Sequence, residues 1–275
     1  MSGSSMLPAN GVSLPGIYGA LGTFAAGNTP GNHYAPAFWT DKNGHLWLFG
    51  GVVNNPGDSD GNLNDLWEFN PSTNEWAWMG GSSAINQPGV NSTLGTPATG
   101  NIPGSRSYAS SWTDRNGSLW LFGGSGDDAS GIQGSLNDIW EFNPSTNEWA
   151  WMGGSSTEGS NGGQSGIYGT LGTPAAANTP GGRYGAMNWT DNSGNFWLLG
   201  GYGFDANGID GYLNDLWVFS PSTNEWTWMS GSTTAYQIGI YGTQGTPAAG
   251  NIPVPDGARG TGSITKAISG CWGEL

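Results

Sequence analysis

The chain has 275 residues, of which 51 are glycine, 16 proline and 16 tryptophan, with only 9% charged residues and a formal net charge of −14. The acidic balance argues against a nucleic-acid partner, which needs basic residues, and no apolar run approaches the ~18 residues of a membrane helix. The composition also disfavours long helices, so we expect an all-β protein with many turns. The single cysteine, Cys271, rules out an intramolecular disulfide framework.

The first predicted module covers 34–79 and reads as four short strands separated by turns. Strand A ends at WTD, and a Lys-Asn-Gly turn leads to strand B, LWLFGG, whose nearly continuous apolar run predicts cover on both faces. Strand C carries LNDLWEF. An Asn-Pro-Ser-Thr-Asn turn, in which proline fixes φ, leads to strand D, EWAWM, whose two tryptophans share a face.

The module returns at 107–152 and 184–229, separated by connectors at 80–106 and 153–183. In each copy 40 residues separate the tryptophan of WTD from the methionine of strand D, whereas 24, 28 and 24 residues separate that methionine from the next N-x-P proline. A constant unit with variable connectors indicates one repeated folded module. Fifteen of the 16 tryptophans occupy five equivalent positions per module, as stacked sheets that bury both faces require.

The Gly-Gly after strand B, the Leu-Asn-Asp-Leu-Trp of strand C and the tryptophans of strand D resemble the kelch repeat. The resemblance covers the three modules and implies a β-propeller, in the broad group that includes the galactose oxidase propeller. We therefore expect three four-stranded antiparallel blades plus part of a fourth, with long connectors from strand D to the next strand A.

The N-terminal end segment is 1–33, and its first residues, Met1 to Ser5, align with Met79 to Ser83 at the end of strand D. We therefore expect this segment to be the end of a preceding blade followed by a connector, and the chain to be a fragment. Three blades cannot close a ring. The outer faces of the end blades are accordingly expected to be hydrophobic and to favour self-association.

The C-terminal end segment, 230–275, contains a connector that leads toward a fourth strand A, after which the pattern is lost. Back-translation of Ser263 to Leu275 in a shifted frame gives DHQGNLWLLGGT, the A–B sequence of a blade. We therefore expect the tail to be a frameshifted start of a fourth blade, in which Cys271 carries no chemistry.

The meander order of the strands predicts which loops share a face. A–B and C–D turns lie on one face, and B–C loops and D–A connectors lie on the other. The B–C loops are expected to be long, at 52–62, 125–135 and 202–212, and the connectors longer still. Functional surfaces concentrate on variable loops, and the kelch resemblance implies partner binding there. The alternative is that the regular connector sequence GxYGTxGTPAxxxNxPG only packs along the ring.

Two sets of repeated side chains are candidate ligand contacts on this face. Tyr18, Tyr168 and Tyr241 recur in a GIYG sequence and could stack on sugars or contact a protein, or could pack on their own blade. Arg106 and Arg183 recur at the start of strand A, near the expected central channel. They could contact a ligand there, or form a structural salt bridge or hydrogen bond.

Acidic residues offer a weaker signal for a metal. Asp58 and Asp60, and Asp205 and Asp210, faintly resemble calcium loops, but no glutamate follows at the spacing of a bidentate ligand, and Asx-Gly turns explain the pattern equally. The aspartates of WTD and LND recur in every module, and we assign them a structural role as acceptors of backbone hydrogen bonds at turns.

Enzymatic interpretations lack the necessary residues, because the chain has only two histidines and no assembled Ser-His-Asp or Cys-His set. A galactose oxidase-like copper site would need several His and Tyr ligands and a cysteine linked to tyrosine. We therefore expect a non-catalytic scaffold without a cofactor that binds a protein or glycan through the B–C/D–A face. The alternatives are a structural spacer and part of an enzyme whose active residues lie in other blades.

The composition, with few lysines and many Gly, Ser, Thr, Asn and Trp, suits an extracellular or cell-surface parent protein. No signal peptide opens this chain.

Overall fold

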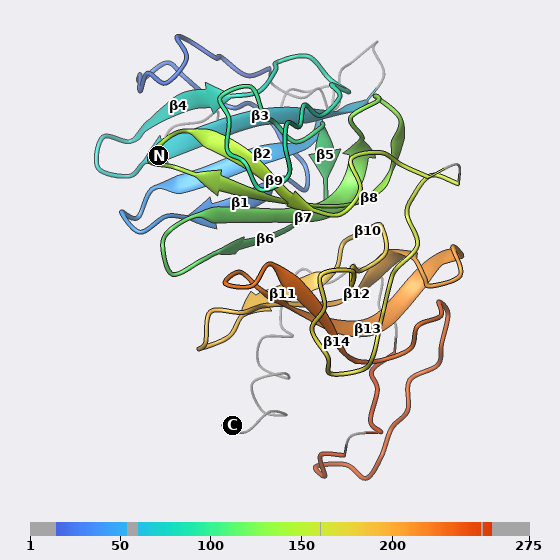
Figure 1. Ribbon diagram of the computed structural model, residues 1–275. Helices are drawn as coiled ribbons and strands as arrows, with labels where there is room; N and C mark the ends of the chain where they lie inside the picture. The colour runs from blue at the N-terminus through green and yellow to red at the C-terminus, as the bar shows by residue number, and fades with distance from the viewer. Residues whose placement is uncertain (1–14, 54–59, 160, 249, 255–275) are drawn as a thin grey trace, which may run out of the picture.

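The computed structural model describes residues 15–53, 60–159, 161–248 and 250–254. Within this part of the chain every regular element is a β-strand, and the strands form three antiparallel sheets (Figure 1). The first sheet contains β1 (Ala37–Thr40), β2 (Leu46–Val53), β3 (Gly61–Asn70) and β4 (Glu75–Gly80). The second contains β5 (Arg106–Ser107), β6 (Ser110–Thr113), β7 (Leu119–Asp127), β8 (Gln133–Asn143) and β9 (Glu148–Gly153). The third contains β10 (Arg183–Tyr184), β11 (Met187–Thr190), β12 (Phe196–Phe204), β13 (Asp210–Ser220) and β14 (Glu225–Ser230).

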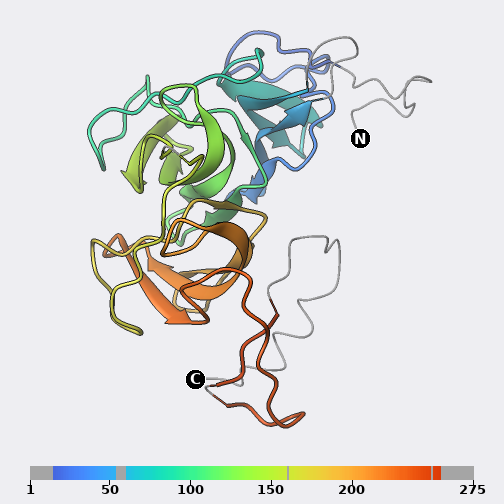
Figure 2. The same cartoon turned by 90° about the vertical axis from the view of Figure 1, so that its right-hand side faces the viewer.

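Each sheet is a meander in which strands A, B, C and D are neighbours in chain order. Strand β6 contacts both β1 and β11 in the neighbouring sheets, and the three sheets follow one another as successive blades (Figure 2). In the second and third sheets strand A is divided into two pieces, β5 with β6 and β10 with β11, which both pair with strand B. The predicted all-β propeller architecture with three four-stranded blades is therefore confirmed. The expected frameshifted strand of a fourth blade lies outside the described residues. Among the described residues, none forms a helix of the length and apolarity needed to cross a lipid bilayer.

The hydrophobic core lies between blades, where aromatic side chains of one sheet face those of the next. One cluster joins the first and second blades and includes Trp47 packed on Phe142, with ring centroids 5.2 Å apart. The other joins the second and third blades and includes Trp112 stacked on Phe196 at 5.3 Å. For this reason strand B of the second blade, β7, which has a neighbouring blade on each side, is covered on both faces.

The B–C loops are shorter than the sequence predicts, and this expectation was wrong. In the second blade β7 and β8 stay paired as far as Asp127 opposite Gln133, which leaves only 128–132 as the loop. The third blade likewise leaves only 205–209. Polar, glycine-rich sequence flanking the turn continues the antiparallel ladder, so these two hairpins extend the blades and the long variable segments are the D–A connectors.

The Gly-Gly of strand B marks a register shift in each B–C ladder. In the second blade the pair is Gly123 and Gly124, with φ of 66° and 106°. A Cβ on Gly123 would lie 2.7 Å from the carbonyl oxygen of Arg183 in the next blade. Glycine is required here because the backbone is left-handed and a neighbouring blade approaches closely.

Substituting Gly123→Ala is expected to lower the free energy of unfolding by about 2–3 kcal/mol, because left-handed strain of about 1–2 kcal/mol adds to overpacking. Gly95→Ala is the matched control, since Gly95 has φ of 70° but nothing within 4 Å of an added Cβ. Urea unfolding of the two variants separates strain from contact. Equal losses in both would contradict a steric role for the neighbouring blade.

Candidate functional site

The two arginines at the start of strand A are buried inside their blades. Arg183 is 1% exposed, and its two terminal nitrogens donate to the two carboxylate oxygens of Asp215 at 2.7 and 2.8 Å. Its Nη1 also donates to the carbonyl of Gly200, the first glycine of the Gly-Gly pair. Arg106 pairs with Asp138 in the same way. These arginines are thus placed as structural ion pairs, with no surface open to a ligand.

The LND aspartates are structural, but their partners differ from those expected. Instead of capping a turn, Asp215 accepts hydrogen bonds from Arg183, from Trp217 Nε1 and from the hydroxyl of Tyr168. Burial raises the pKa of Asp215, but the Arg183 guanidinium outweighs it, so the net pKa is lowered. The carboxylate therefore stays charged at the centre of the blade.

The first blade carries a weaker version of this network. His33 replaces the arginine, with Nε2 3.5 Å from Asp65 Oδ2 and Nδ1 2.6 Å from the carbonyl oxygen of Gly50. Burial raises the pKa of Asp65, and the nearby His33 reduces this rise without cancelling it. Asp65 Oδ1 is buried without a hydrogen-bond partner. An imidazole does not replace the bidentate guanidinium.

The GIYG tyrosines pack on the blades that follow them. Tyr168 is 6% exposed, its ring lies 4.8 Å from Trp217, and its hydroxyl donates to Asp215. Tyr18 makes the same contacts with Trp67 and Asp65 in the first blade. These two tyrosines therefore attach the connector to the blade, and their packed rings offer little surface to a partner. Tyr241 is 78% exposed in the last connector.

Asn91 stands where the second connector would carry this tyrosine, so Asp138 lacks a phenolic donor. Asn91→Tyr is expected to raise the free energy of unfolding by about 0.5–2 kcal/mol by restoring the contacts seen in the other two blades. Asn91→Phe should gain the ring packing but lose about 1 kcal/mol relative to the tyrosine, because it cannot donate to Asp138. Chemical denaturation measures both. A tyrosine variant no more stable than the natural chain would contradict this account.

Two of the four aspartates considered for calcium, Asp205 and Asp210, accept hydrogen bonds from the protein itself. Asp205 is buried; its Oδ1 accepts the backbone N–H groups of Asn207 and Ile209, and its Oδ2 accepts that of Ala235. Asp210 accepts the hydroxyl of Tyr202 at 2.9 Å. Asp60 is exposed, and Asp58 lies outside the described residues. Asp205 shapes the B–C turn and ties it to the following connector.

The WTD aspartates likewise organise the A–B turns. One group of metal-ligand side chains in the described residues includes such an aspartate: Asp41, His45 and Glu68 have ligand atoms within 4.8 Å of one another. Asp41 Oδ1 accepts two backbone N–H groups and Oδ2 accepts Trp47 Nε1, while His45 Nδ1 lies 2.5 Å from Glu68 Oε1. Asp114 makes the same turn contacts without a histidine. The turn and one hydrogen bond between His45 and Glu68 therefore account for the group.

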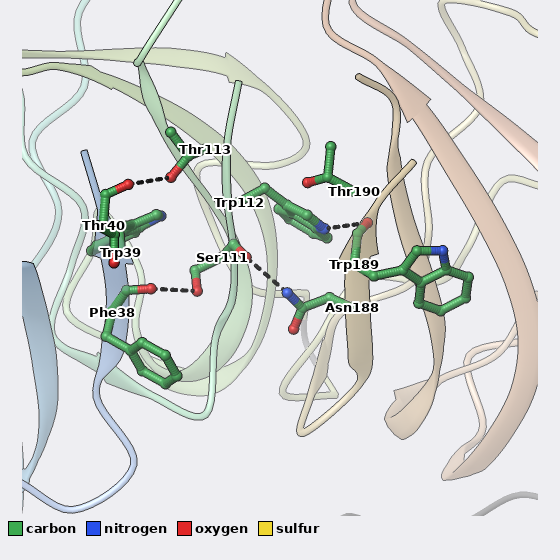
Figure 3. A pocket seen from close by; sticks show the side chains of 9 residues that line it. All are labelled: Phe38, Trp39, Thr40, Ser111, Trp112, Thr113, Asn188, Trp189 and Thr190. Atoms are coloured by element: carbon green, nitrogen blue, oxygen red, sulfur yellow. Dashed lines mark hydrogen bonds between the residues drawn. The ribbon is translucent and has the colours of Figure 1, made fainter. Parts of the chain in front are cut away.

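Hydrogen bonds between neighbouring blades run along the inner wall formed by β1, β6 and β11. This wall lines a hollow of about 340 Å³, shown in Figure 3. Ser111 Oγ donates to the carbonyl of Phe38, and Asn188 Nδ2 donates to that of Ser111. Trp112 Nε1 crosses to the carbonyl of Trp189 in the same way. These polar groups join neighbouring blades, although Phe38 remains 74% exposed.

A continuous row of tyrosine rings crosses the B–C/D–A end of the blades. Successive ring centroids lie 5.7, 6.2, 5.6, 5.2 and 6.2 Å apart. The row takes in three blades and the connector after the third, and it contains all six tyrosines that lie outside the GIYG sequences. We call these residues the tyrosine row: Tyr34, Tyr108, Tyr184, Tyr202, Tyr212 and Tyr236.

Sequence reasoning missed the tyrosine row because only two of its members, Tyr34 and Tyr184, occupy equivalent positions. Tyr34 and Tyr184 follow the His33 and Arg183 positions directly, whereas Tyr108 is one residue further along than they are. The sequence does contain one signal for the row. All six tyrosines outside the GIYG sequences lie near an end of strand A, B or C or in a connector.

Tyr108 is one of two members of the row with left-handed backbone, the other being Tyr236 with φ of 59°. The φ of Tyr108 is 56°, whereas Ala35 and Gly185 occupy the equivalent positions in the other blades. Its backbone N–H donates to the carbonyl of Ala35, and its own carbonyl accepts from Gly185, which links the three blades. Hydrogen bonding with Tyr34, together with burial, raises the pKa of Tyr108 to about 12, so its hydroxyl is protonated at neutral pH. A bulky residue in left-handed backbone is uncommon, and such strain gathers at functional sites.

Comparison with known proteins identifies similar solved structures but no family. No protein-family model matches the chain, and no curated protein matches it. Among solved structures, that of YjhT is similar, with 16% sequence identity and a TM-score of 0.47 over 76% of this chain and 55% of that one. The chain thus spans about half the length of YjhT.

Proposed function

We propose that this chain is a kelch-type propeller segment that acts as a non-catalytic binding scaffold, with its partner on the B–C/D–A face. The single observation that carries the proposal is the tyrosine row on that face. Tyrosine supplies a large apolar ring and a polar hydroxyl at little entropic cost, which is why it is enriched where proteins meet partners. An extracellular or cell-surface setting is part of the proposal and rests on composition alone.

Arrays of glycans and of purified proteins, probed with the chain, test the proposal. Saturable binding should be lost when Tyr34 and Tyr212, which are 66% and 44% exposed, are both changed to alanine. Leu46→Ala is the matched control, because Leu46 is 43% exposed beside the A–B turn on the opposite face. Absence of saturable binding, or equal loss in the control, would leave the structural spacer as the better interpretation.

A further inference from the structure

The tyrosine row is exposed to solvent at both ends and at Tyr212, whereas Tyr108, Tyr184 and Tyr202 are half-buried. Its outer members Tyr34 and Tyr236 are 66% and 59% exposed, and Tyr212 is 44% exposed. A ligand can therefore reach the three exposed rings fully, and the half-buried rings between them in part, without moving the chain. An exposed tyrosine ring offers an apolar face for stacking, and its hydroxyl both donates and accepts hydrogen bonds.

The charges near this face do not favour an anionic partner. Within the described residues, the basic side chains at this end of the blades are Arg106, Arg183 and His33, and all three are buried against aspartates. Burial, with nearby Asp138 and Asp128, raises the pKa of Glu158 to about 8, so this carboxyl is mostly neutral at pH 7. An anionic ligand would meet no accessible cation here and would be repelled by the net charge of −14.

The shape of the row distinguishes a sugar chain from a protein surface. Residues that dominate protein interfaces fill well-packed pockets, but the hollows of about 340 and 300 Å³ lie at the inner wall and beside the A–B and C–D turns. The row is a strip that crosses three blades. A strip of rings with hydroxyl edges matches a ligand made of repeated rings with hydroxyl groups.

We propose that the tyrosine row binds an uncharged polysaccharide chain along its length, with sugar rings against tyrosine rings. The inference rests on the proposed function and names the partner class for that face. Because several rings contribute in sequence, affinity should grow with the number of linked sugars, and a single sugar should bind too weakly to measure.

Isothermal titration calorimetry with defined oligosaccharides tests the proposal. The probes are cellohexaose, xylohexaose, mannohexaose, laminarihexaose and chitohexaose, with glucose as the short probe and hexagalacturonate as the anionic one. At least one neutral hexasaccharide should bind saturably, glucose should not bind measurably, and hexagalacturonate should bind at least about tenfold more weakly. No saturable binding to any neutral hexasaccharide, or stronger binding of hexagalacturonate, would overturn the proposal.

Tyr108→Gly is the decisive variant, because glycine occupies the equivalent position in the third blade and relieves the φ of 56°. The variant should therefore fold, and urea unfolding checks that it does. Loss of one stacking ring should weaken hexasaccharide binding about tenfold. Phe38→Ser is the control, since Phe38 is an exposed aromatic on the inner wall and serine occupies its position in the second blade.

The outcomes separate this inference from the function on which it rests. Equal affinity in Tyr108→Gly and the natural chain, or equal loss in Phe38→Ser, would refute the tyrosine row as the sugar site. A purified protein could bind the natural chain but not the Tyr34→Ala, Tyr212→Ala double variant, while no hexasaccharide binds. In that case the scaffold function stands and the polysaccharide is excluded. If neither class binds, both proposals fail.

Discussion

Replacing Arg183 by methionine is expected to lower the free energy of unfolding by about 3–5 kcal/mol, because it leaves the Asp215 carboxylate charged and buried without its partner. Asp215 would keep its bonds from Trp217 and Tyr168, but neither group carries a compensating charge. The carbonyl of Gly200 would also lose its donor. Urea unfolding followed by tryptophan fluorescence measures the change.

Two further variants fix the cause. Arg115→Met removes the same charge from an exposed side chain and should change the unfolding free energy by no more than about 0.5 kcal/mol. Arg183→His reproduces the His33–Asp65 arrangement of the first blade and should lose less than Arg183→Met. An Arg183→Met loss no greater than that of Arg115→Met would show that the ion pair contributes nothing to stability.

The blades could be predicted from sequence because their determinants are local. Strand D places Trp226 and Trp228 two residues apart on one face, and the turn that precedes it needs only proline and asparagine. The Arg106–Asp138 pair joins residues 32 positions apart, and nothing in their spacing predicts contact. The sequence therefore shows that these arginines recur in successive modules, but it does not indicate which aspartates they bind.

The tyrosine row could not be predicted for a different reason. It depends on how the blades stack, because Tyr34, Tyr108 and Tyr184 come from three sheets and meet only at the inner end of each. Aligning the repeats emphasises equivalent positions and therefore drew attention to Tyr168, which is buried. A partner surface that spans non-equivalent positions is invisible to such an alignment. It emerges once the blades are placed side by side.

Stacking between blades should also dominate stability, and one position isolates its contribution. Leu119 begins strand B of the second blade and is fully buried against the first blade, where its core cluster includes Trp39 and Trp47. Leu119→Ala is expected to cost about 2–5 kcal/mol, because the lost transfer free energy adds to a cavity that two rigid sheets cannot close.

Leu46 supplies the matched control, since it begins strand B of the first blade at the same position but is 43% exposed. Leu46→Ala should cost no more than about 0.5 kcal/mol, as a surface substitution does. The two variants carry the same chemical change in the same strand context and differ in whether a neighbouring sheet covers the side chain. If their unfolding free energies fall equally, the blades would owe their stability to contacts within each sheet, and the tyrosine row would lack the rigid stacking that holds its rings in line.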